Sequence, residues 1–87
     1  MLAQSFSKNF GLYGERTGTL SIVCSSTEEK AVIQSRFKET CLPIYSNPPI
    51  HGARIVDLIL SDEELTNEWK SEVLSMANRL KNLRIDI

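Results

Sequence analysis

The sequence predicts an α/β fold in which one or two short strands precede three helices. Residues 19–24, Thr-Leu-Ser-Ile-Val-Cys, are rich in β-forming side chains that alternate as they do in a mostly buried strand. Two helix-capping signals, each a serine followed three residues later by a glutamate, add to this pattern. They are Ser26 with Glu29 and Ser61 with Glu64. One or two strands cannot form a sheet that supports three helices, so we expect the chain to be a segment of a larger domain, cut at both ends.

The residues before this strand are expected to be extended at first and then irregular. Ser5 and Ser7 flank Phe6, and in an extended segment this spacing places both hydroxyls on one face. Three glycines interrupt the next stretch and predict turns, with a role in backbone shape only. They are Gly11, Gly14 and Gly18.

The first helix is expected to follow Ser26 and to end at Pro43. Its inner face has an apolar residue or cysteine every four positions, at Ile33, Phe37 and Cys41. Residues 45–52, Tyr-Ser-Asn-Pro-Pro-Ile-His-Gly, predict a rigid loop, because the two prolines lack N–H donors and restrict the residues before them.

Two further helices are expected after this loop. Residues 53–60 form a short apolar helix, and a long amphipathic helix then runs from the second capping signal nearly to the C-terminus. The apolar stripe of the long helix consists of Leu65, Trp69, Val73, Met76, Leu80 and Leu83. We assign Trp69 and Met76 to packing in the core or between subunits, and we expect exposed apolar surface on this helix to cause self-association.

Composition narrows the function without identifying it. The 87 residues form one small domain or part of a larger one, and 41% of them are hydrophobic. A net charge of −1 gives no basic footprint for nucleic acid or an anionic membrane surface, and no apolar run approaches the ~20 residues of a membrane span. The N-terminus has no leader pattern, which favours a cytoplasmic location, although a mitochondrial form stays open if the natural N-terminus lies upstream. Cys24 and Cys41 predict two reduced, packed thiols, and no metal site is expected.

The stretch from residue 5 to residue 18, SFSKNFGLYGERTG, places an amine among hydroxyls, aromatic rings and a guanidinium. A lone lysine is usually a solvated surface group. A lysine attacks a carbonyl only as the neutral amine, a form that apolar neighbours or a nearby cation favour. The candidate apolar neighbours of Lys8 are Phe6, Phe10, Leu12 and Tyr13. Arg16 and the two serines suit a phosphate, so the set matches what pyridoxal phosphate requires of a protein, although such residues also cluster on ordinary surfaces.

This stretch resembles the cofactor-lysine signature of the class I pyridoxal-phosphate-dependent aminotransferases, most closely the aspartate aminotransferases. The stretches YSNPPIHGARIV and LSDEELTNEWKSEVLSMANRLKNLR resemble the same family at matching distances, so nearly the whole chain is covered. The resemblance implies a fragment of the three-layer α/β fold of these transferases. Residues 1–60 would be the C-terminal part of the large, cofactor-binding domain, and residues 61–87 would begin the long helix that links to the small domain.

The resemblance also assigns roles to the residues around Lys8. It implies that Lys8 is the Schiff-base lysine that holds pyridoxal 5'-phosphate and then transfers the substrate proton as general acid and base. The phosphate-holding positions match Ser5, Ser7 and Arg16. A second set matches the pocket near the subunit contact and a loop that reaches the neighbouring subunit's site, with packing an equally good interpretation. This set is Tyr13, Ser46 and Asn47.

The implied function, in a complete protein, is reversible amino-group transfer between an L-amino acid, aspartate by resemblance, and a 2-oxo acid in a homodimer. Leu42 stands where aspartate-specific members carry the arginine that pairs with the substrate's distal carboxylate. A leucine cannot make that contact, so an apolar or aromatic substrate, or loss of function, is compatible with the sequence. Family members run to several hundred residues, so the isolated chain is expected to be inactive. The alternative is a truncated, non-catalytic relic or interaction fragment.

Overall fold

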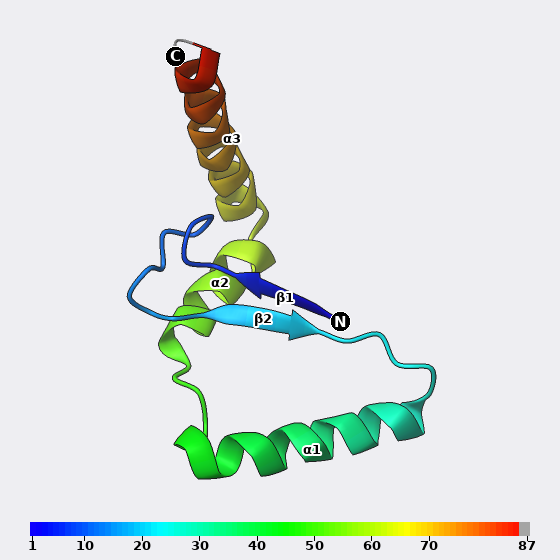
Figure 1. The fold of residues 1–87 in the computed structure, drawn as a ribbon. Coiled ribbons are helices and arrows are strands. Elements are labelled where there is room, and N and C mark those ends of the chain that lie inside the picture. The colour runs from blue at the N-terminus through cyan, green and yellow to red at the C-terminus, as the bar shows by residue number, and fades with distance from the viewer. Residues whose placement is uncertain (86–87) are drawn as a thin grey trace.

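The computed structural model describes residues 1–85 as two strands followed by three helices (Figure 1). The elements are β1 (Leu2–Ser5), β2 (Gly18–Ser21), α1 (Thr27–Tyr45), α2 (His51–Ser61) and α3 (Glu63–Ile85). This order is the one that the sequence predicts. The expected linking segment 61–87 includes residues 86 and 87, which lie outside the described residues.

The strands β1 and β2 form an antiparallel two-stranded sheet in which Ala3 lies opposite Leu20. They approach so closely at Gly18 that a β-carbon there would overlap the main-chain carbonyl of Gln4. Both boundaries predicted for this strand, residues 19 and 24, are wrong. Pairing begins at Gly18 and stops at Ser21, because β1 supplies Leu2 as its last partner and no other strand among residues 1–85 continues the ladder.

Helix α1 begins where the sequence predicts and ends later. The Ser26 hydroxyl accepts a hydrogen bond from the Glu29 N–H at 3.1 Å, which confirms the cap. The prediction that Pro43 ends the helix is wrong. A proline lacks its own N–H but leaves the donors of the residues after it, and the Ser46 N–H still donates to the Leu42 carbonyl at 3.1 Å, so the last turn forms beyond the proline.

The expected loop 45–52 and short helix 53–60 are shifted in the structure. Irregular backbone covers residues 46–50, because α1 extends to Tyr45 and α2 already begins at His51. The cap of α3 is also one residue later than predicted: the Leu65 N–H donates to the Asp62 carboxylate at 2.9 Å, while Ser61 is the last residue of α2. An aspartate accepts this bond as well as a serine does.

Helices α2 and α3 pack against each other, and the Thr66 hydroxyl ties them by donating to the Ile59 carbonyl at 2.7 Å. Helix α1 lies apart from them and from the hairpin (Figure 1). The expected inner face of α1 is correspondingly incomplete within residues 1–85, where Phe37 is 39% exposed and Cys41 is half-buried. Cys24 and Cys41 are both free thiols, but each is half-buried and not fully packed as the sequence predicts.

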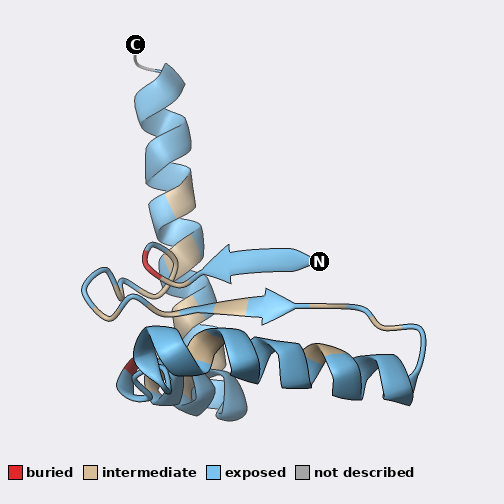
Figure 2. Ribbon diagram, turned by 60° about the horizontal axis from the view of Figure 1, so that its bottom comes forward, coloured by how far each residue is buried: buried red, intermediate tan, exposed pale blue. Residues whose placement is uncertain are grey.

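The chain is much more open than a compact protein of its size. Its radius of gyration is 17.1 Å, against about 12 Å for a compact chain of this length. Its accessible surface is 7549 Å², against about 5,200 Å² for a compact protein of this mass. Among residues 1–85 only Ser7, Gly52 and Val56 are buried, and exposed ribbon dominates Figure 2. None of the helices in this range combines the length and apolar character that a membrane crossing requires.

Candidate functional site

The loop between β1 and β2, residues 6–17, carries Lys8, and we call it the lysine loop. The turn in it that begins at Lys8 and ends at Gly11 is the lysine turn. The Phe6 N–H donates to the Thr17 carbonyl at 3.0 Å and closes the loop at its base. A turn follows in which the Gly11 N–H donates to the Lys8 carbonyl at 3.2 Å. Gly11 has a φ of 65°, a conformation that glycine adopts without steric cost. The hairpin thus fixes the two ends of the loop, and the turn places Lys8 at its start.

Ser5 and Ser7 come together, but not within one extended segment as predicted: β1 ends at Ser5, and Ser7 lies in the turn that follows. The Ser5 hydroxyl donates to the Ser7 hydroxyl over 3.1 Å and accepts the Ser7 N–H at 3.2 Å. Ser7 is one of the few buried residues, with 8% of its surface exposed. The two hydroxyls therefore form a fixed pair at the point where β1 leads into the loop.

Arg16 lies with these serines around one open hollow of about 330 Å³. The hollow is lined by Ala3, Gln4, Ser5, Ser7, Arg16, Thr17 and Gly18. Its polar side chains are hydroxyls, an amide and a guanidinium, and none of the lining residues is acidic. This donor set suits a phosphate group, since hydroxyl and guanidinium donors match its acceptor oxygens. The structure thus brings together the three residues predicted to hold phosphate.

Arg16 is held in a defined backbone conformation. Its φ is 52°, in the left-handed region, and its guanidinium donates to the Tyr13 carbonyl at 3.2 Å. Thr17, which sequence reasoning missed, also lines the hollow, and its hydroxyl donates to the Glu15 carbonyl at 3.2 Å. Its position directly after Arg16 is the sequence signal for its place in this lining.

Lys8 is exposed and does not line this hollow. Its Nζ lies 4.3 Å from the centroid of the Tyr13 ring, a cation–π contact. The expected apolar surroundings form only in part. Phe6 and Phe10 instead contact each other edge to face, with their centroids 5.3 Å apart. The ring that lies against the amine is that of Tyr13.

Trp69 of helix α3 contacts the lysine loop. The indole N–H donates to the Asn9 carbonyl at 2.8 Å, and the indole stacks on Phe10 with centroids 4.5 Å apart. The sequence predicted a packing role for Trp69 and gave no indication of this partner. The side-chain oxygen of Asn9 is buried without a hydrogen-bond partner among the described residues.

Ser46 and Asn47 lie elsewhere, at the end of α1. They line a hollow of about 570 Å³ together with Leu42, and neither lines the hollow beside Arg16. The structure therefore does not bring these two residues to the lysine loop. Their predicted reach into a neighbouring subunit's site stays a prediction.

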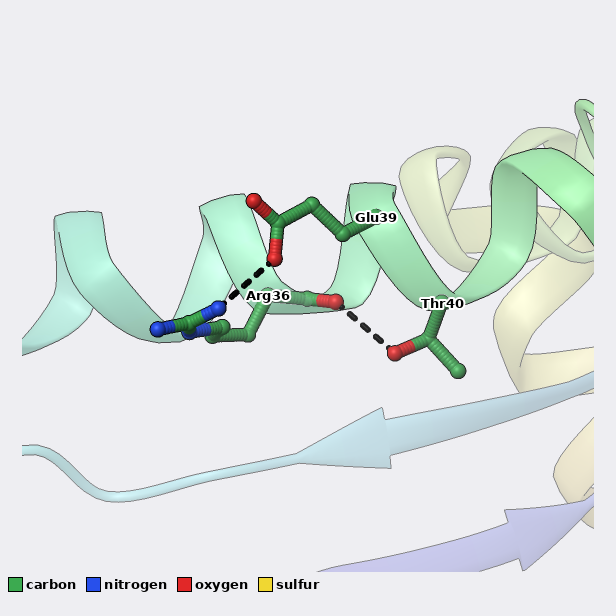
Figure 3. A network of polar contacts seen from close by, with 3 residues as sticks. All are labelled: Arg36, Glu39 and Thr40. Carbon is green, nitrogen blue, oxygen red and sulfur yellow. Dashed lines mark hydrogen bonds and ion pairs between the residues drawn. The ribbon is translucent and has the colours of Figure 1, made fainter.

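The polar contacts on the body of α1 are surface contacts. Arg36 forms an exposed ion pair with Glu39 at 2.9 Å, and its carbonyl accepts the Thr40 hydroxyl at 2.9 Å (Figure 3). Exposed pairs of this kind add little to stability. Residues 1–85 also hold no group of three acidic, histidine or cysteine side chains placed to bind a metal ion.

Residues 1–86 match the protein family described as aminotransferase class I and II. The chain belongs to this family. The mitochondrial aspartate aminotransferase of Dictyostelium discoideum is 54% identical to it over 83 residues, which are 95% of this chain and 20% of that protein. The chain thus spans about a fifth of the length of such relatives.

Solved aminotransferase structures share the fold of this segment. A mitochondrial aspartate aminotransferase from Trypanosoma brucei superposes with a TM-score of 0.92 at 46% identity, over 95% of this chain and 22% of that one. An aromatic-amino-acid aminotransferase from Burkholderia pseudomallei, covalently bound to pyridoxal phosphate, gives 0.91 at 44% identity, over 94% and 21%. The family and fold predicted from the sequence are therefore confirmed. The relatives include mitochondrial, cytoplasmic and chloroplastic proteins, so membership of the aminotransferase family does not fix the compartment.

Proposed function

We propose that this chain is the cofactor-lysine segment of an aspartate aminotransferase-like enzyme that moves an amino group between an L-amino acid and a 2-oxo acid. The observation that carries the proposal is the hollow that Ser5, Ser7 and Arg16 share, at the base of the loop that presents Lys8. Further support comes from the names of the relatives, several of which are aspartate aminotransferases, and from the pyridoxal phosphate bound to one solved neighbour.

The residues of the loop would serve both cofactor binding and proton transfer. Ser5, Ser7 and Arg16 would hold the phosphate of pyridoxal 5'-phosphate by donated hydrogen bonds. When bound, this cofactor withdraws electrons from the substrate's α-carbon and so makes its proton removable. Lys8 would bind the cofactor covalently through Nζ, and its amine, once released, would accept and return that proton.

Tyr13 would keep the amine in place between these roles. Its ring lies 4.3 Å from the Lys8 Nζ and attracts the charged form of the amine. This contact holds the amine beside the ring without using any of its N–H donors in a hydrogen bond. We assign Tyr13 to positioning of Lys8 for this reason.

The remaining assignments concern the rest of the enzyme. We propose that residues 1–60 belong to the large domain and that residues 61–87 begin the helix that links it to the small domain, consistent with the break between α2 and α3 at Asp62. We also propose a homodimer in which Ser46 and Asn47 approach the partner's site. These residues are exposed at the end of α1, where a neighbouring chain has access to them.

Covalent labelling tests the role of Lys8. The purified 87-residue chain is incubated with pyridoxal phosphate, reduced with borohydride and digested, and the labelled lysines are identified by mass spectrometry. We expect preferential labelling of Lys8 over Lys70 and Lys81, with competition by inorganic phosphate and a weaker preference in Arg16→Ala. Equal labelling of all lysines contradicts the proposal. So does an equal aldimine absorbance in the wild type and in Lys8→Ala, measured after pyridoxal phosphate is added and before reduction.

A further inference from the structure

The Trp69 side chain of helix α3 contacts the lysine loop. The Trp69 indole donates to the main-chain carbonyl of Asn9, which lies directly after Lys8, over 2.8 Å. These residues are 60 positions apart in the sequence, so the bond joins the loop to a separate element. The acceptor belongs to the backbone, and the bond therefore fixes the path of the chain beside Lys8.

A second contact of Trp69 fixes the next residue. The indole and the Phe10 ring are nearly parallel, at 12°, with centroids 4.5 Å apart. Phe10 in turn contacts Phe6 edge to face, and Phe6 closes the base of the loop through Thr17. The stack thus connects α3 to both ends of the lysine turn.

The turn has few other supports on this side. Within it, the Lys8 carbonyl accepts the Gly11 N–H, and the Leu12 N–H donates to the Phe6 carbonyl at 3.4 Å; both bonds are local and do not join the turn to another element. Lys8 itself is exposed, and the contact found for its amine is with Tyr13 of the same loop. The direction in which the amine points therefore depends on how the turn is held from outside.

We propose that Trp69 is a positioning residue for Lys8, which orients the lysine turn through its bond to Asn9 and its stack on Phe10. The inference rests on the proposed function of Lys8 for its relevance to catalysis. It does not rest on that function for its test. A role in packing α3 against α2 alone would leave the reactivity of Lys8 unchanged when the indole N–H is removed.

The test uses the complete chain and two readouts that need no cofactor. One is amide hydrogen exchange in residues 6–12. The other is competitive labelling of lysines by trinitrobenzenesulfonate, expressed as the rate for Lys8 divided by the rate for Lys70. Trp69→Phe keeps an aromatic ring and removes the N–H donor, whereas Trp69→Leu removes both contacts.

We expect exchange in residues 6–12 to be about fivefold faster in Trp69→Phe, the effect of one lost hydrogen bond, and faster still in Trp69→Leu. The relative rate for Lys8 should rise about two- to fivefold as the amine leaves the Tyr13 ring. Helix content by circular dichroism verifies that each variant folds, and the Phe variant carries the test if the Leu variant does not.

Two control variants separate the positioning role from general loosening. Asn9→Ala keeps the main-chain carbonyl and removes an unpaired buried oxygen, so it should retain the wild-type values. Leu80→Ala changes an exposed residue about 16 Å further along α3 and should also have no effect. Unchanged exchange and labelling in both Trp69 variants overturn the proposal, as does an equal effect of the two controls. If pyridoxal phosphate does not select Lys8 but these readouts respond, the proposed function fails and the positioning role stands.

Discussion

Gly52 at the start of α2 lies directly against Thr17 of the lysine loop. A β-carbon at position 52 would overlap the Thr17 hydroxyl and would come within 3.1 Å of the Glu15 β-carbon. Gly52 is buried, although its neighbours His51 and Ala53 are exposed. Helix α2 therefore supports the Arg16 side of the loop by close approach, whereas Trp69 contacts its Lys8 side.

Gly52→Ala is expected to destabilise the docking of this loop. Alanine is the better helix former by up to about 1 kcal/mol, but overpacking typically costs about 1–3 kcal/mol, so the overlap prevails. Trp69, the single tryptophan of the chain, reports the docking because it stacks on Phe10. Urea unfolding followed by its fluorescence should show a lower midpoint in the variant.

Two further variants identify the cause of that loss. Gly14→Ala has open space around the added methyl group and should be neutral or slightly stabilising. Thr17→Ala removes the overlapping hydroxyl, so it should recover part of the stability when combined with Gly52→Ala. Additive losses in the double variant would contradict the proposed contact.

Local signals in the sequence predicted the local structure. Ser26 caps α1 because its hydroxyl needs only the N–H of Glu29, three residues away. Ser5 meets Ser7 because its hydroxyl accepts the N–H of Ser7, two residues further on, where the chain leaves β1 and turns. The prediction at Pro43 was wrong, because the bonds of the following residues, not the proline alone, decide where the helix ends.

The periodicity of the sequence could not predict the long-range contacts. The partner of Trp69 is 60 residues away, and an apolar stripe specifies a buried face without specifying what covers it. The same holds for Gly52. Position 52 needs a glycine because Thr17, in the lysine loop, leaves no room for a side chain there. The roles proposed for Lys8 and Arg16 came from a family resemblance, since their residue types alone also occur on ordinary surfaces.

The first turn of α1 is expected to depend on pH through Glu29. Its carboxylate accepts hydrogen bonds from the Ser25 hydroxyl, at 2.6 Å, and from the Ser25 N–H, and these bonds hold the pKa of Glu29 below its ordinary value of 4.5. A lowered pKa stabilises the folded turn above the ordinary value, and this contribution is lost as the pH falls through the folded-state pKa. Circular dichroism at 222 nm should therefore decrease on acidification below about 4.5.

Glu29→Gln should remove part of that acid transition and lower the helix signal at neutral pH. Glu28→Gln makes the same change in charge in the same helical turn and serves as the control, since the Ser25 bonds are specific to Glu29. Identical acid transitions in the two variants would show that these bonds do not contribute.

Tyr45 near the end of α1 is expected to titrate at higher pH than an ordinary tyrosine. Its hydroxyl donates to the Cys41 sulfur at 3.5 Å, and this bond, together with the charge of the cysteine, raises the pKa of Tyr45 above 10.0. The bond stabilises the helix end at lower pH, and its contribution is lost as the pH rises through the raised pKa. Absorbance at 295 nm in a Tyr13→Phe background should show this titration move down in Cys41→Ala, and an unchanged titration would refute the contact.

Leu42 is predicted to weaken selection for dicarboxylic substrates. It is 66% exposed and lines the same hollow as Ser46 and Asn47, the residues proposed to approach the partner's site. A leucine provides no donor for a distal carboxylate, whereas arginine provides a bidentate one. The test is a chimera in which this chain replaces the matching segment of the Dictyostelium discoideum enzyme.

In that chimera, Leu42→Arg should raise kcat/KM for aspartate about a hundredfold, which corresponds to the ~3 kcal/mol lost when a buried charge has no partner. The value for phenylalanine should stay the same or fall, because its side chain has no carboxylate to bind. Leu42→Lys supplies charge without the planar fork and should recover less. An aspartate-to-phenylalanine ratio that does not change in Leu42→Arg would mean that position 42 does not contact the substrate, and Lys8→Ala in the same chimera should abolish activity towards both amino acids.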